Sequence, residues 1–123
     1  MNPLGILLIS GGHERAHYAL VMATAAAALG RPVTLFATNA GIRLLLADRP
    51  LEADPREAAI TAQGVAGIRA LLEAAQELGV GLSICDSGRM TEGLGGAALL
   101  EGVEVSGAVG FLGETHGAQM LSI

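Results

Sequence analysis

The 123-residue chain lacks several residue types on which whole classes of protein function depend. It contains no tryptophan, and aromatic residues make up only 2% of it, which argues against a stacking platform for nucleic-acid bases or sugars. All seven basic residues are arginines, and the absence of lysine excludes Schiff-base catalysis and the phosphate-binding lysine of a P-loop. The only cysteine, Cys85, excludes an internal disulfide bond.

Charged residues are scarce as well, at 15% of the chain against a usual share of about 25%. The formal net charge is -5 and no basic cluster is visible, so we expect no direct binding to nucleic acid. Few polar residues remain to cover the surface, and we therefore expect a homo-oligomer. We expect no transmembrane segment, because the longest uncharged run, residues 16–30, is too short to cross a bilayer. We expect no signal peptide either, because the start MNPLGILLIS lacks a basic region and runs directly into a strand-like segment. A single cysteine favours a reducing, cytoplasmic location.

The length fits a single domain over residues 1–123, in which strand-like and helix-like segments alternate. This alternation predicts an α/β fold: a three-layer arrangement with a five-stranded, mainly parallel sheet between helices, flavodoxin-like in outline. We expect strands at residues 4–9, 33–37, 80–84, 103–105 and 118–123. We expect helices at residues 13–29, 40–47, 58–78, from about 87, and 107–114. Residues 48–55, with two prolines, are expected to form a long surface loop.

Two of the expected helices have apolar patterns that lead to specific predictions. The helix at 13–29 is apolar around its whole circumference, so this helix, or the one after Cys85, is expected to contribute to a subunit interface. In the helix at 58–78, apolar residues recur at helical spacing and predict the buried side. These residues are Val65, Ile68, Leu72, Ala75 and Leu78.

Cys85 is the main candidate for chemistry, because it ends an apolar strand and precedes a helix. In an open α/β sheet, ligands collect at the carboxyl ends of the strands, and a thiol beside free amides there tends towards the thiolate. Arg89 and the helix N-terminus favour that ionisation, whereas Asp86 opposes it. The alternative is that Cys85 is a small apolar residue of the core, and the sequence leaves both interpretations open.

Loops at the same edge of the sheet supply further candidates for binding an anion or a substrate. These candidates are Gly11, Gly12, His13, Asn39, Ser87 and Arg89. Gly11 and Gly12 have an alternative role in a tight turn, and Asn39 has one as a helix cap. His116 comes just before the last strand, so we expect it at the opposite edge.

Residues 13–17, HERAH, match the H-E-x-x-H pattern of zinc hydrolases. No third ligand follows at a suitable distance, and we interpret the segment as a polar first turn that faces solvent. No G-x-G-x-x-G continues from Gly11 and Gly12, so dinucleotide binding has little support. We therefore expect neither a metal nor a cofactor.

Three segments together resemble the DsrE/DsrF-like family of small sulfur-carrier proteins. They are LLISGGHERAHYALVMATAAAALGRPVTLFATNAGIRLL, ICDSGRMTEGLGGAALLEGVEVSGAVGFL and AQMLSI. In that family a strand-end cysteine is followed by a helix, a Gly-hydrophobic pair, a Leu and a Gly-Val. The corresponding residues here are Cys85, Gly93-Leu94, Leu99 and Gly102-Val103.

The resemblance implies a five-stranded parallel sheet between helices and a sulfur-relay function. It implies that Cys85 accepts sulfane sulfur as a persulfide and passes it on, with a sulfur donor protein and an acceptor protein as partners. The segment Asp86–Met90 departs from the Met-rich, Ser-containing segment of one branch of the family, which leaves the partners open. The alternatives are a non-catalytic binding or assembly subunit of the same fold and, third, a small-ligand or nucleotide-binding module.

Overall fold

Five short strands form the central sheet of the computed structural model, which describes residues 1–123. The strands are β1 (Leu4–Leu8), β2 (Val33–Ala37), β3 (Gly81–Cys85), β4 (Glu104–Ser106) and β5 (Gln119–Ser122). Their order is β4-β3-β2-β1-β5, and every neighbouring pair is parallel. The α/β fold with a five-stranded parallel sheet is therefore confirmed.

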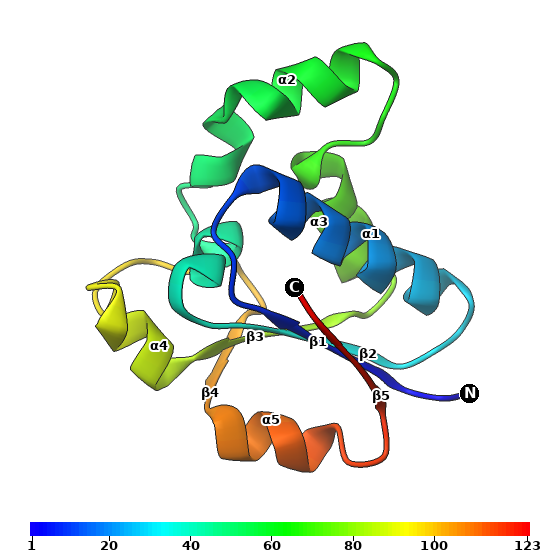
Figure 1. Cartoon of the computed structure of the whole chain (residues 1–123), viewed down its shortest axis with the longest axis vertical. Coiled ribbons are helices and arrows are strands. Elements are labelled where there is room, and N and C mark those ends of the chain that lie inside the picture. The colour runs from blue at the N-terminus through cyan, green and yellow to red at the C-terminus, as the bar shows by residue number, and fades with distance from the viewer.

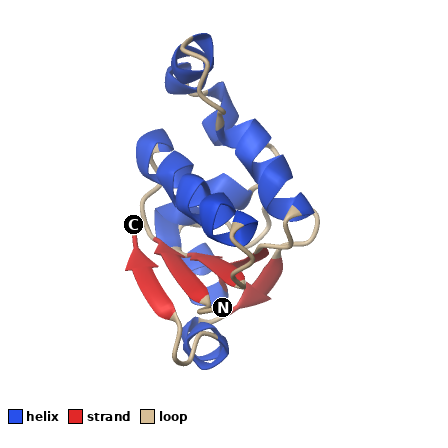
Figure 2. Ribbon diagram, turned by 90° about the vertical axis from the view of Figure 1, so that its right-hand side faces the viewer, coloured by secondary structure: helices blue, strands red, loops and turns tan.

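The strand order explains why the two faces of the sheet are covered unequally. From β1 to β4 each strand is added on the same side of the previous one, and right-handed crossovers then place the connecting helices on one face. That face carries α1 (His13–Ala28) and α3 (Ile68–Glu77), with α2 (Pro55–Ala62) beyond them (Figure 1). The return from β4 to β5 crosses the other face, where α5 (Ala108–Glu114) lies alone (Figure 2).

The core follows the same division, because side chains alternate between the two faces of a strand. In β3, Leu82 and Ile84 belong to the large core under α1 and α3. Cys85 instead belongs to a small cluster with Phe36 of β2 and Phe111 of α5. The last residue of β3 therefore points its thiol to the thinly covered face.

Helix α1 packs closely on the sheet and on α3 through small side chains. Ala16, Ala19 and Ala23 are fully buried on its inner side, and so is the larger Leu20. Tyr18 remains exposed on its outer side, and Leu29, which follows the helix, is exposed as well. The predicted subunit interface on this helix stays a prediction.

The prediction of a single helix at residues 58–78 is wrong. The chain forms α2 and α3, separated by a turn in which Gly64 has a φ of 81°, a backbone angle that favours glycine. Ile68, Leu72 and Ala75 are buried as predicted, because they belong to α3. Val65 and Leu78 lie outside the helix and are exposed.

Two other segments also differ from expectation. The segment after β2 is a 3-10 helix, Asn39–Leu45, rather than an α-helix at 40–47, and no side chain caps it. The loop expected at 48–55 contains a second 3-10 turn, Pro50–Ala53. Pro55 already begins α2, which Asp54 caps by accepting a hydrogen bond from the Arg56 amide at 2.8 Å. No helix of the chain has the length and apolar character that crossing a membrane requires.

Candidate functional site

Cys85 occupies the junction between β3 and the short helix α4 (Asp86–Thr91). Its backbone is still extended, with φ of -82° and ψ of 123°, and it serves as the N-cap of α4. The Gly88 amide donates to Sγ at 3.4 Å, and the Ser87 hydroxyl lies 3.3 Å from the same sulfur. The sulfur therefore takes the place of the side-chain oxygen that usually accepts the first free amides of a helix.

Close contact between α4 and the end of β2 completes this environment. The pairing of Ala37 with Ile84 brings the residues that follow β2 beside the end of β3. A Cβ at Gly88 would overlap the Thr38 hydroxyl and come within 2.8 Å of the Asn39 amide nitrogen. A glycine at position 88 is therefore needed for α4 to lie against Thr38 and Asn39.

The local hydrogen bonds change the acidity of the thiol. Burial opposes ionisation, but hydrogen bonds from the Ser87 hydroxyl, the Gly88 amide, the Thr38 hydroxyl and the Ser87 amide outweigh it and lower the pKa of Cys85. The groups that lower this pKa are neutral donors. Arg89, expected from the sequence to favour the thiolate, instead points one guanidinium nitrogen at Asp86, 3.8 Å from its carboxylate.

The thiol lies just beneath the surface rather than on it. Cys85 retains 7% of its accessible area, whereas its neighbours Asp86 and Ser87 are exposed. On the α5 side it packs with Phe36 and Phe111, whose rings stack with centroids 4.6 Å apart and planes inclined by 10°. Polar donors and an aromatic wall thus surround the same sulfur atom.

Two of the predicted binding residues, Ser87 and Asn39, lie at this site, and Arg89 follows one helical turn after Cys85. The Arg89 Nε is buried and has no hydrogen-bond partner. Gly11 lies against Ala40, so the loop after β1 adjoins the segment after β2. Gly12 is the N-cap of α1 and is exposed.

His13 is placed differently from the prediction of a solvent-facing turn. It is almost completely buried, and its Nε2 lies 2.7 Å from the carboxylate of Glu57 in α2. His17 stacks on it at 5.8 Å and is hydrogen-bonded through Nε2 to the Ala66 carbonyl at 2.8 Å. Both histidines therefore tie α1 to the α2–α3 segment, which is the role of the HERAH sequence in this fold. His116 is exposed and comes just before β5, at the edge opposite Cys85.

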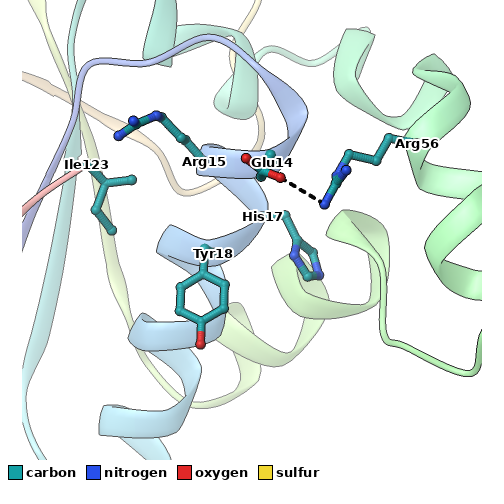
Figure 3. Close-up of a pocket in the computed structure, with 6 residues that line it drawn as sticks. All are labelled: Glu14, Arg15, His17, Tyr18, Arg56 and Ile123. Atoms are coloured by element: carbon teal, nitrogen blue, oxygen red, sulfur yellow. Dashed lines mark ion pairs between the residues drawn. The ribbon is translucent and has the colours of Figure 1, made fainter.

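The largest hollow of the surface lies elsewhere, along α1 and the end of β5. It measures about 440 Å³ and is lined by Glu14, Arg15, His17, Tyr18, Arg56 and Ile123 (Figure 3). Glu14 and Arg56 pair across it at 3.1 Å, while Arg15 and Tyr18 point in other directions. None of the residues around Cys85 lines this hollow, and its polar groups do not converge on one point.

Sequence analysis missed four residues of the Cys85 environment as site residues: Thr38, Gly88, Phe36 and Phe111. For Thr38 the signal was its position directly after a strand that neighbours β3. From the sequence, Gly88 could be predicted only as a turn residue, because its tight contact is with Thr38 and Asn39 in a distant segment. No local signal marks Phe36 and Phe111, since their meeting depends on the crossover of α5.

Comparisons with known proteins agree with this structure. Residues 4–116 match the DsrE/DsrF-like family. The fold is similar to that of the YchN protein from E. coli, with a TM-score of 0.77, 20% sequence identity and full coverage of both chains. It is also similar to that of MTH1491 from Methanobacterium thermoautotrophicum, with a TM-score of 0.61, 20% identity and full coverage of both chains. No curated protein sequence matches the chain.

A family match over most of the chain, together with this sheet order and a cysteine at the end of the third strand, leads to one conclusion. The chain belongs to the DsrE/DsrF-like family.

Proposed function

We propose that this protein carries sulfane sulfur as a persulfide on Cys85 and passes it to a thiol of a partner protein. The observation that carries the proposal is the set of hydrogen-bond donors around Sγ, which lowers the pKa of Cys85. The thiolate is the form that attacks sulfur, and a lowered pKa raises its fraction at neutral pH. The family to which the chain belongs is associated with sulfur relay, which supports the same reaction.

The chemistry needs no group beyond the thiols. The Cys85 thiolate attacks the outer sulfur of a donor persulfide; a bond forms to Sγ, the donor S–S bond breaks, and the donor leaves as a thiolate with the electron pair. In the second transfer, a partner's thiolate attacks the outer sulfur of the Cys85 persulfide, and the S–S bond to Cys85 breaks. The Gly88 and Ser87 donors stabilise Cys85 as it becomes a thiolate again.

Residues around the thiol are proposed to hold the incoming donor. Ser87 lies at the sulfur, Asn39 lies against Gly88, and the buried Arg89 Nε lacks a hydrogen-bond partner one turn further along α4. An unsatisfied guanidinium donor is suited to an anionic group on the donor. Gly11 and Gly12 lie in the adjoining loop and extend this surface.

The test is loading of the purified protein with glutathione persulfide, followed by intact-mass spectrometry. We expect a gain of the mass of one sulfur atom, reversed by a reducing agent and absent in Cys85→Ser. Ser83→Ala is the matched control, because Ser83 is a buried residue of the same strand and the same face. Absence of the added sulfur from the wild type would contradict the proposal.

The burial of Cys85 favours a second function, a non-catalytic assembly subunit of the same fold. In that case the thiol is a core residue, and it stays unmodified in folded protein at neutral pH. A wild-type protein that takes up no sulfur but binds a sulfur-relay partner would support this alternative.

We further propose a cytoplasmic homo-oligomer. Tyr18 on α1, Leu29 directly after it and Met90 on α4 are exposed apolar side chains, and charged residues make up only 15% of the chain. Sedimentation at micromolar concentration should show more than one subunit, and a monomer would contradict this proposal.

A further inference from the structure

Helix α5 covers the Cys85 side of the sheet but is attached to it by very few side chains. Phe111 is its only buried residue, with 4% of its area exposed, and its ring stacks on Phe36. Val109 and Leu112 are 88% and 63% exposed. No side-chain hydrogen bond or ion pair joins α5 to another helix or strand.

The helix is also intrinsically weak. It has seven residues, of which Gly110 and Gly113 are glycines, and each glycine in a helix costs about 1 kcal/mol relative to alanine. Just beyond its end, Thr115 packs over Gly5 of β1. The start of α5, which follows Ser106, has no such anchor, and Ser106 pairs directly with Cys85 across β3 and β4.

We infer that α5 is an opening cover over Cys85, with Phe111 as its anchor. In the closed form the Phe36–Phe111 pair closes one side of the thiol and leaves Cys85 only 7% exposed. In the open form α5 unwinds locally and Phe111 leaves Phe36, so that a second thiol reaches Sγ. The purpose of the cover rests on the proposed sulfur relay, but its existence does not.

Local unfolding of this kind occurs where few buried contacts hold a segment, and its free energy is below that of global unfolding. A reagent that modifies only the open form then reacts at a rate proportional to the open population. Removing the anchor raises that population, whereas raising the helix propensity of α5 lowers it.

The experiment measures the rate at which iodoacetamide alkylates Cys85 in the folded protein. Rates are compared at the plateau of their pH profiles, so that differences in thiol pKa do not enter. Phe111→Ala is expected to react at least about tenfold faster than wild type, equivalent to about 1.4 kcal/mol less stable closure. Leu112→Ala is the matched control, because it removes an exposed apolar side chain from the same helix and should leave the rate unchanged.

A second variant tests the cover in the opposite direction and does not depend on Phe111→Ala remaining folded. A Cβ at Gly113 would meet no atom within 4 Å, so Gly113→Ala adds helix propensity without a clash. We expect alkylation about fivefold slower than in wild type. The inference is overturned if Phe111→Ala reacts no faster than Leu112→Ala, or if Gly113→Ala is not slower than wild type.

The same proteins separate this inference from the proposed function. If alkylation rates change as expected while no variant gains sulfur from glutathione persulfide, the cover exists and the relay proposal fails. If the wild type gains sulfur while the alkylation rates of all variants are equal, the relay stands and the cover does not.

Discussion

Substitution of Glu57 tests how helices α1, α2 and α3 are held together. Its carboxylate is hydrogen-bonded to His13 Nε2 at 2.7 Å and accepts from the amides of Ile68 and Arg69 at 2.9 and 3.3 Å. Those amides are the first of α3, whose own N-cap, Gly67, has no side chain. A Cβ at Gly67 would overlap the carboxylate. Glu57 therefore caps α3 from α2, a helix that has no buried residue of its own.

The cost of Glu57→Ala follows from these contacts. Loss of a helix cap costs about 0.5–2 kcal/mol, and leaving the buried His13 without its partner costs about 1–3 kcal/mol. The Glu57 side chain is only 13% exposed, so little water reaches the groups to which it is hydrogen-bonded. Water therefore compensates for few of the hydrogen bonds that Glu57→Ala removes. Urea unfolding at pH 7 should show a loss of about 1.5–5 kcal/mol, the sum of the two contributions.

The matched control is Glu73→Ala on α3. That side chain is 62% exposed and reaches only Arg69, at 3.9 Å. Its removal is expected to change the free energy of unfolding by no more than about 0.5 kcal/mol. An equal effect of the two substitutions would refute the capping role of Glu57.

The pH dependence supplies an independent check. Burial opposes ionisation of Glu57, but the bonds from His13, Ile68 and Arg69 outweigh it and lower the pKa of the carboxyl group. A lowered folded-state pKa contributes stability that is complete above the unfolded value of roughly 4.3 and is lost as the pH falls through the folded value. The stability difference between wild type and Glu57→Gln should therefore narrow below about pH 4. A difference that stays constant from pH 7 to pH 3 would contradict this account.

Two further predictions concern the donors around Cys85. Ser87→Ala removes a hydrogen bond to the thiolate and should raise the midpoint of the alkylation pH profile by roughly half a unit to one unit. Thr91→Ala, which removes a hydroxyl from the same helix, is the control and should leave the midpoint in place. Gly88→Ala should destabilise the protein by about 1–3 kcal/mol in urea unfolding, because its Cβ would overlap the Thr38 hydroxyl, just after β2. Gly96→Ala, where a Cβ meets nothing within 4 Å, should be neutral, and equal effects of the two substitutions would argue against the tight contact.

Sequence reasoning located the strands well because each is a short apolar run between turn residues. The third strand and Cys85 at its end were found to within a residue, and β4 was found one residue later than expected. The error at residues 58–78 has a physical cause. The apolar spacing continued across Gly64 and Gly67, but the carboxylate of Glu57 stabilises a new helix start at Ile68. A capping partner eleven residues away leaves no trace in the local pattern.

By itself, the sequence determined the fold class and the position of Cys85 at the end of a strand, because strand and helix periodicity and the turn after Cys85 are local properties. Only the tertiary structure decided what surrounds the sulfur. The face to which Cys85 points, its contact with Phe36 and Phe111, and the closeness of Thr38 follow from strand order and register. The same holds for His13, which the packing of α2 places against Glu57 rather than at the sheet edge with Cys85. These contacts join residues tens of positions apart, and no local pattern encodes them.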